Sequence, residues 1–198
     1  MSHLLVYLHG HGSSPSMVHP FFRQQHDDGW VRICPQAPHP TEGGWSWFDS
    51  GPRGVDSVTL SSSVAAVVEV VDAALTETGG AWTDVVLGGF SQGAALALAA
   101  AARLATEGTV LGGLLLQAGF LPATFDDEID VAPVAARSVL IQHGDSDEVV
   151  PAFMADDLAA LIGSATSGPA PKLQRLPGGH VLSPAMLDAA REWLEGMQ

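Results

Sequence analysis

Ser91 lies at the centre of the pattern Gly89-Phe90-Ser91-Gln92-Gly93, in which a glycine stands two positions away on each side. The apolar residues Val85 to Leu87 before it are typical of a buried strand, and Gly93 to Leu104 after it has a helix-forming Ala/Leu composition. A strand that turns into a helix within five residues needs a tight, strained turn, and glycine tolerates such a turn. Because this turn exposes the serine hydroxyl, we expect Ser91 to be a nucleophile.

A serine hydroxyl is a weak nucleophile, so it needs a base within reach, and a histidine base needs a carboxylate to orient its ring. His180 follows two glycines in a predicted loop, which suits this base. Asp145, Asp147 and Glu148 follow another predicted strand and compete for the role of the acid. We favour Asp147, because a residue beside a strand end, such as Asp145, more often caps a turn. The chain order serine, acid, histidine is that of an α/β-hydrolase.

The other candidate ligands and nucleophiles carry weaker signals. His9 and His11 form an H-x-H pair, but no carboxylate or cysteine completes a recognisable ligand set, so we expect no metal and a structural role for His9. His143 is expected to support the site or a turn. Cys34 is the single cysteine, which excludes an internal disulfide and favours a cytoplasmic location and a core position for this residue.

The charge balance is strongly acidic, with 22 Asp and Glu against eight Lys and Arg and a net charge of −14. This charge argues against nucleic acid and anionic membrane surfaces as partners. The sequence has no uninterrupted apolar run of about 18 residues, so we expect no integral membrane association. The first residues lack a basic segment, and we expect no secretory signal. At 198 residues, we expect residues 1–198 to form a single domain.

Apolar runs and helical periodicity alternate along the chain. The predicted strands cover residues 4–8, 30–34, 85–87, 111–116, 138–142 and 172–176. The first predicted helix has its apolar positions from 64 to 75 and ends at Gly79-Gly80, and the later helices cover 93–104, 151–162 and 184–194. A long loop from residue 36 to about 58 separates the second strand from the first helix. Alternating elements with apolar strands predict an α/β fold, a three-layer, doubly wound, mostly parallel sheet of about six strands. Ligands of such sheets bind beyond the carboxyl ends of the strands, where His9, Ser91, Asp147 and His180 stand.

Six blocks of the sequence, in this order, together resemble the phospholipase/carboxylesterase family of α/β-hydrolases, which includes acyl-protein thioesterases and small bacterial carboxylesterases. The blocks are Leu8-His9-Gly10, Pro35-Gln36-Ala37-Pro38, Trp47-Phe48-Asp49, Gly89-Phe90-Ser91-Gln92-Gly93-Ala94, His143-Gly144-x-x-Asp147-x-Val149-Val150-Pro151 and Gly179-His180.

This resemblance implies Ser91 as the nucleophile, Asp147 as the acid and His180 as the base. It also implies an oxyanion hole formed by the backbone N–H groups of His11 and Gln92, with no metal or organic cofactor. The family usually has an apolar residue where this chain has His11, which makes the mouth of the site more polar.

The expected reaction is the hydrolysis of small-molecule carboxylic esters or thioesters of short to medium acyl chains through an acyl-enzyme on Ser91. The acidic segment from Asp126 to Asp130 disfavours a long acyl tunnel. Alternatives are an acyl-protein thioesterase or lysophospholipase and, from another class, a non-catalytic protein that binds a small ligand. A peptidase is disfavoured because no insertion would hold a peptide, and the sequence allows a monomer or a homodimer. The candidate residues for binding substrate are Trp47, Phe48, Phe120, Leu121, Phe153 and Val181.

Overall fold

A six-stranded sheet forms the centre of the computed structural model, which describes residues 3–26, 28–51, 54–123, 134–165 and 169–197. The strand order is β10-β9-β8-β7-β1-β2, and every pair of neighbouring strands is parallel. The predicted mostly parallel sheet is therefore confirmed. The strand bounds are β1 His3–Leu8, β2 Trp30–Ile33, β7 Val85–Phe90, β8 Leu111–Gln117, β9 Ala136–Gly144 and β10 Lys172–Leu176.

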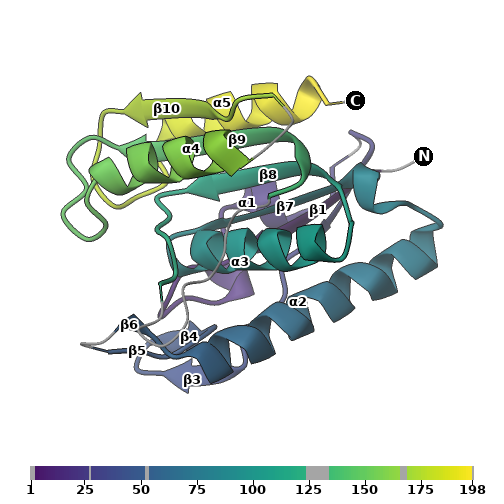
Figure 1. Cartoon of the computed structure of the whole chain (residues 1–198), viewed down its shortest axis with the longest axis horizontal. Helices are drawn as coiled ribbons and strands as arrows, with labels where there is room; N and C mark the ends of the chain where they lie inside the picture. The colour runs from purple at the N-terminus through teal and green to yellow at the C-terminus, as the bar shows by residue number, and fades with distance from the viewer. Residues whose placement is uncertain (1–2, 27, 52–53, 124–133, 166–168, 198) are drawn as a thin grey trace.

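Helices cover both faces of the sheet, as the doubly wound arrangement requires (Figure 1). Helices α2 (Ser57–Thr78), α3 (Gln92–Thr106) and α4 (Phe153–Ala165) contribute side chains to the core on one face. The short α1 (Pro20–Arg23) and α5 (Pro184–Glu195) pack on the other face, against Leu5 and Tyr7 of β1 and neighbouring strand residues. Successive side chains of β1 point to opposite faces of the sheet, so Leu4, Val6 and Leu8 belong to the first core and Leu5 and Tyr7 to the second.

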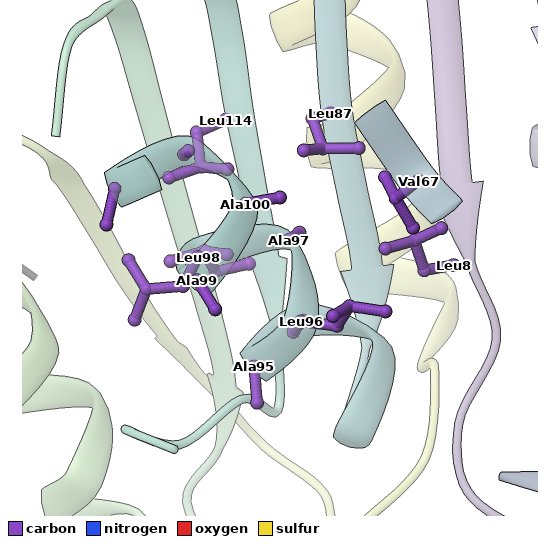
Figure 2. Close-up of a cluster of buried hydrophobic side chains, with 14 of the residues drawn as sticks. Leu8, Val67, Leu87, Ala95, Leu96, Ala97, Leu98, Ala99, Ala100 and Leu114 are labelled. Carbon is purple, nitrogen blue, oxygen red and sulfur yellow. The ribbon is translucent and has the colours of Figure 1, made fainter. Parts of the chain in front are cut away.

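Helix α3 is the most deeply buried helix described, and it carries the candidate nucleophile at its start. Its alanines let the helix backbone lie close to the sheet, and Leu96 and Leu98 fill the space between it and neighbouring elements (Figure 2). Leu87 of β7 and Leu114 of β8 are buried in the same core. The small side chains bring the start of α3 against the strand ends, which positions the site.

Helix α2 begins earlier than the periodicity predicts, because Asp56 caps it by accepting a hydrogen bond from the Thr59 N–H. It ends at Gly79, which has a φ of 68° and supplies the left-handed C-cap. Among the described helices, α2 alone is long and apolar enough to cross a membrane by length and composition. Core helices pass the same test, and α2 buries Leu60, Val64, Val67, Val71 and Leu75.

The predicted long loop contains two small hairpins that the sequence pattern did not indicate. They are β3 (His39–Thr41) with β4 (Gly44–Ser46), and β5 (Ser50–Gly51) with β6 (Gly54–Val55). The first hairpin holds the loop that follows β1, because the Gly12 N–H donates to the Trp45 carbonyl and the Trp45 N–H donates to the Ser13 carbonyl, each at 2.9 Å. Two short 3-10 turns, η1 (Pro15–Met17) and η2 (Trp82–Asp84), complete the described elements.

Candidate active site

Ser91 occupies a strained turn between β7 and α3. Its φ of 54° and ψ of −118° lie where non-glycine residues are rare. A Cβ on Gly93 would collide with the carbonyl of Leu8, and a Cβ on Gly89 would lie 2.5 Å from the backbone carbon of Gly93. Both glycines are therefore needed for the close approach of α3 to β1, and this approach leaves Ser91 at the apex of the turn.

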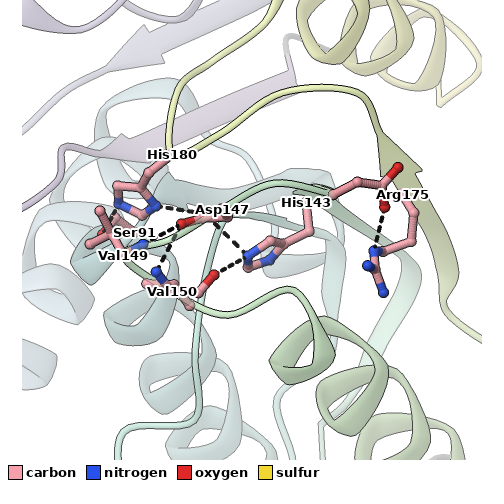
Figure 3. A network of polar contacts seen from close by, with 8 residues as sticks. Ser91, His143, Asp147, Val149, Val150, Arg175 and His180 are labelled. Carbon is pink, nitrogen blue, oxygen red and sulfur yellow. Dashed lines mark hydrogen bonds and ion pairs between the residues drawn. The ribbon is translucent and has the colours of Figure 1, made fainter.

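The side chains of Ser91, His180 and Asp147 form one hydrogen-bonded chain (Figure 3). His180 Nδ1 lies 2.7 Å from Asp147 Oδ2, and His180 Nε2 lies 2.9 Å from Ser91 Oγ. An ionised carboxylate only accepts hydrogen bonds, so the hydrogen of His180 is on Nδ1. His180 Nε2 is then the acceptor for the Ser91 hydroxyl, which is the arrangement that a general base requires.

Asp147 is buried, and three hydrogen-bond donors and the ring of His143 surround its carboxylate. Oδ1 accepts from the backbone N–H groups of Val149 and Val150 at 2.9 and 2.8 Å, and Oδ2 accepts from His180. His143 Nε2 lies 3.2 Å from the same Oδ2 and 2.8 Å from the Val150 carbonyl oxygen, to which it donates. Burial would raise the pKa of Asp147, but the hydrogen bonds from His180 and the two amides outweigh burial and hold this pKa below its ordinary value.

The structure separates the three carboxylates that competed in the sequence. Asp145 is exposed and pairs with Arg175 at 3.0 Å, and Glu148 is exposed as well. Asp147 is the carboxylate that meets His180. His143, at the end of β9, is fully buried beside Asp147, consistent with the supporting place expected for it.

The backbone N–H groups of His11 and Gln92 are available for an incoming ligand. Within the described part of the chain, neither N–H donates to a protein acceptor. Gln92 is the first residue of α3, where an N–H has no partner within the helix. The Gln92 side chain is buried and held by Trp47 and Phe48, since its Oε1 accepts from the Trp47 N–H at 2.9 Å and its Nε2 donates to the Phe48 carbonyl at 2.8 Å.

The side chain of His9 holds the loop between β1 and η1 in place. The His9 ring is buried, with Nδ1 donating to the Gly10 carbonyl at 2.8 Å and Nε2 accepting from the Ala37 N–H at 3.3 Å. Burial lowers the pKa of His9, although the bond to Gly10 opposes this shift. Both ring nitrogens are occupied, and no cluster of three or more metal-ligating side chains occurs among the described residues. His9 therefore has a structural role here.

Two cavities of similar size flank the hydrogen-bonded chain. The Ser91-side cavity has a volume of about 310 Å³, and the His180-side cavity has a volume of about 300 Å³; His11 lines both. The first is lined by Phe48, Ser91, Gln92, Phe120, Val150 and Met154. The second is lined by His9, His19, Phe90, His180, Met17 and Val181.

The residues predicted to bind substrate lie in different places. Phe48 and Phe120 line the Ser91-side cavity, whereas Val181 lines the His180-side cavity. Trp47 differs from the prediction, because it is 2% exposed and its Nε1 donates into the core to the His9 carbonyl at 2.8 Å. Leu121 and Phe153 also differ, since they are exposed and line neither of the two cavities.

Met154 and His19 also line these cavities, although neither was predicted to do so. Met154 follows Phe153 in the first turn of α4. Because Phe153 was predicted to line the site, the next residue of the same predicted helix could have been considered as well. His19 had no such signal, because only the fold brings it near His180. The segment from Asp126 to Asp130 lies outside the described residues.

Comparison with known proteins gives a family and a fold. The sequence profile of the phospholipase/carboxylesterase family matches residues 1–198. A search of characterised protein sequences finds no significant match. Among solved structures, esterase PE8 is 26% identical with a TM-score of 0.75, over 100% of this chain and 93% of its own.

Two other solved structures support the α/β-hydrolase fold. Acyl-protein thioesterase 2 of Zea mays is 22% identical with a TM-score of 0.75, over 99% of this chain and 94% of its own. The Bacillus cereus carboxylesterase is 20% identical with a TM-score of 0.80, over 100% of this chain and 89% of its own.

Proposed function

Because the chain belongs to the phospholipase/carboxylesterase family, we propose that it is a serine hydrolase that cleaves small-molecule carboxylic esters or thioesters of short to medium acyl chains. The observation that carries the proposal is the unbroken chain of hydrogen bonds from Ser91 Oγ through His180 to Asp147. The backbone N–H groups of His11 and Gln92, which donate to no protein acceptor among the residues that the structure describes, lie at the same site. A pure binding protein has no need for this combination.

In the proposed reaction, Ser91 Oγ attacks the acyl carbonyl carbon while His180 Nε2 takes the hydroxyl proton. The carbonyl oxygen becomes an oxyanion that accepts hydrogen bonds from the His11 and Gln92 N–H groups. His180 then gives its proton to the leaving oxygen or sulfur, the bond from the acyl carbon to that atom breaks, and an acyl ester of Ser91 remains. Water, deprotonated by His180, attacks this ester and releases the acid.

Asp147 acts in both halves of this cycle, because it holds the hydrogen of His180 on Nδ1 and stabilises the imidazolium that forms. Its lowered pKa keeps it ionised at neutral pH. The side chains and backbone groups named here supply the nucleophile, the base and the oxyanion donors, so the proposed mechanism uses no metal ion or organic cofactor. The lone cysteine supports a cytoplasmic location.

The Ser91-side cavity is the proposed acyl site. It reaches Ser91 and Gln92, where the acyl carbonyl must sit, and its walls include Phe48, Phe120 and Met154. Its volume of about 310 Å³ lies at the lower end of the range for small-molecule pockets. This volume supports short to medium acyl chains over the long chains of an acyl-protein thioesterase or lysophospholipase.

The test is direct detection of the acyl-enzyme. Purified protein mixed with p-nitrophenyl butyrate should release a burst of p-nitrophenol, and intact-mass measurement should find one butyryl group, which peptide mapping places on Ser91. Ser91→Ala and His180→Ala should each lower kcat by roughly a million-fold, the scale known for another serine hydrolase, with the double variant little worse than either.

Ser62→Ala is the matched control, because Ser62 is an exposed serine of α2 outside the site. This variant should keep the full burst. Substantial activity in Ser91→Ala protein, purified free of host esterases, would reject Ser91 as the nucleophile. Ligand binding without turnover in the unmodified protein would favour the non-catalytic alternative.

A further inference from the structure

We propose that the His180-side cavity binds the leaving group of the substrate and that this leaving group is an uncharged alcohol carrying a further oxygen, as glycerol does. This inference rests on the proposed function, since it assigns the second half of the same ester. The proton that the leaving oxygen needs comes from His180 Nε2, so the leaving group must lie beside that nitrogen when the bond to the acyl carbon breaks. Of the two cavities that flank the hydrogen-bonded chain, this one is lined by His180.

The histidines of this cavity present hydrogen-bonding groups to a ligand. His19 Nδ1 accepts from the Phe21 N–H at 3.2 Å, which puts the ring hydrogen on Nε2. This Nε2–H has no acceptor within the described part of the chain, so it is available to an oxygen of a ligand. His11 Nδ1 is hydrogen-bonded to the Ser46 hydroxyl at 3.1 Å. The other ring nitrogen of His11, Nε2, therefore remains for a ligand.

Most of the remaining walls are apolar. Phe90, Val18, Leu182 and the exposed side chains of Met17 and Val181 supply them, beside Gly10, Ser13 and the buried side chain of Tyr7. None of the described lining residues is Asp, Glu, Lys or Arg. A phosphate-bearing leaving group, such as that of a lysophospholipid, would lose water without gaining a cationic partner, and the net charge of −14 would repel it.

The mixed lining matches a small alcohol with an apolar body and one free hydroxyl group. The apolar walls contact its carbon atoms, and His19 Nε2–H donates to its second oxygen. During acylation, the alkoxide that departs takes the proton of His180 and leaves as the neutral alcohol, while the acyl group stays on Ser91. The alcohol therefore affects acylation and has no part in deacylation, because every butyrate ester forms the same butyryl-enzyme.

The experiment compares esters that share the butyryl group and differ in the alcohol. Glyceryl monobutyrate, propyl butyrate, butyrylcholine and 1-butyryl-glycerol 3-phosphate are assayed for kcat/KM below any critical micelle concentration. We expect glyceryl monobutyrate to exceed propyl butyrate and to exceed the phosphate and choline esters by at least about tenfold, since the lining offers no Lys or Arg to the phosphate and no Asp or Glu to the choline. Equal or better cleavage of the phosphate ester would overturn the inference.

His19→Asn tests the donor while keeping the α1 cap, because asparagine is a strong N-cap residue and its shorter side chain removes Nε2. The ratio of kcat/KM for glyceryl to propyl butyrate should fall by roughly three- to tenfold, the range for one lost neutral hydrogen bond. An unchanged ratio would overturn the role of His19. This ratio is an internal comparison, so partial misfolding of a variant does not alter it.

Met17→Trp narrows the same cavity from an exposed position and should lower kcat/KM for propyl and glyceryl butyrate relative to methyl butyrate. Met154→Ala, in the Ser91-side cavity, is the matched control and should change the dependence on acyl length while leaving the glyceryl-to-propyl ratio unchanged. If Met17→Trp changed the dependence on acyl length and Met154→Ala changed the dependence on the alcohol, the two cavities would have the opposite roles and the inference would be overturned. An acyl-enzyme on Ser91 with no effect of either His180-side variant would reject this inference alone, whereas absence of the acyl-enzyme would reject the proposed function.

Discussion

The hydroxyl of Ser46 lies 3.1 Å from Nδ1 of His11, the residue whose backbone N–H is one of the two proposed oxyanion donors. Ser46 is buried, and its Oγ also accepts from Gln92 Nε2 at 2.9 Å and donates to the Phe48 carbonyl at 2.9 Å. The Phe48 carbonyl at 2.9 Å and Gln92 Oε1 at 3.2 Å are both acceptors for its only hydrogen; with the hydrogen on either of them, the contact with His11 places a hydrogen on His11 Nδ1. Ser46 thus joins the side chains of both residues that would supply the oxyanion hole.

We predict that Ser46→Ala lowers kcat by about tenfold with little change in KM, because the donors lose alignment while the binding cavities remain. Loss of a complete oxyanion donor costs about a hundredfold or more, so loss of a positioning group should cost less. Affinity for a boronic acid, which forms a tetrahedral adduct with Ser91, should fall in proportion to kcat, while affinity for the product butyrate should not change.

A double-mutant cycle checks that Ser46 acts through His11. His11→Leu keeps the backbone N–H and removes the side-chain contact with Ser46, together with the ring Nε2 that faces the His180-side cavity. In the Ser46→Ala background, His11→Leu should add less to the loss of kcat than it does alone. Fully additive effects would show that the two residues act independently.

The central sheet could be predicted from sequence because its strands are buried on both faces. Leu4 to Leu8 is apolar at every position, and β1 covers the same residues with His3 added. The β3–β4 hairpin could not be predicted, because its strands are three residues long and contain proline and glycine. Its pairing depends on contacts with the loop at Gly12 and Ser13, which are distant in sequence.

The positions of the site residues were predicted more closely than the cavity walls. Ser91 and His180 stand at strand ends, where the topology of a parallel sheet brings loops together. A wall residue depends instead on which way one side chain points. Trp47 and Phe48 are adjacent, yet Trp47 points into the core and Phe48 lines the Ser91-side cavity. Helix α4 begins two residues later than predicted, and Met154 faces the cavity instead of Phe153.

Asp147→Asn should lower kcat by roughly four orders of magnitude while leaving the protein folded. Asparagine can still accept from Val149 and Val150, but it lacks the charge that stabilises the His180 cation and can favour the wrong tautomer. Asp145→Asn is the matched control two positions away, and it should retain most activity because Asp145 pairs with Arg175 at the surface. If the Asp145 variant were the slower of the two, the proposed acid would be wrong.

The lowered pKa of Asp147 also predicts how stability depends on pH. Its pKa in the folded protein is below its value in the unfolded chain, which is about 3.9, so the ionised group stabilises the fold above that value. This stabilisation is lost as the pH falls through the folded pKa. The difference in unfolding free energy between the unmodified protein and Asp147→Asn should therefore shrink from pH 7 to pH 3 in urea titrations. A difference that stays constant over this range would contradict the predicted linkage.

Gly93→Ala should destabilise the protein by at least about 3 kcal/mol, because its Cβ would collide with the Leu8 carbonyl and neither backbone can move freely in this core. Gly163→Ala is the control, since Gly163 is in α4 and the nearest atom to an added Cβ is 3.6 Å away, on Pro171. This second variant should be neutral or more stable by up to about 1 kcal/mol. Thermal unfolding of both variants measures the difference, and equal effects would contradict the close packing at the elbow.

The acyl preference follows from the size of the Ser91-side cavity. Each methylene buried there contributes about 0.8 kcal/mol, so kcat/KM should rise over short acyl chains and stop rising by roughly eight carbons, when the cavity of about 310 Å³ is filled. Monomeric p-nitrophenyl esters from acetate to palmitate, each below its critical micelle concentration, measure this profile. Met154→Ala enlarges the cavity and should move the plateau to longer chains. A rise that continues to palmitate in the unmodified protein would contradict the short acyl site and favour a long-chain thioesterase or lysophospholipase.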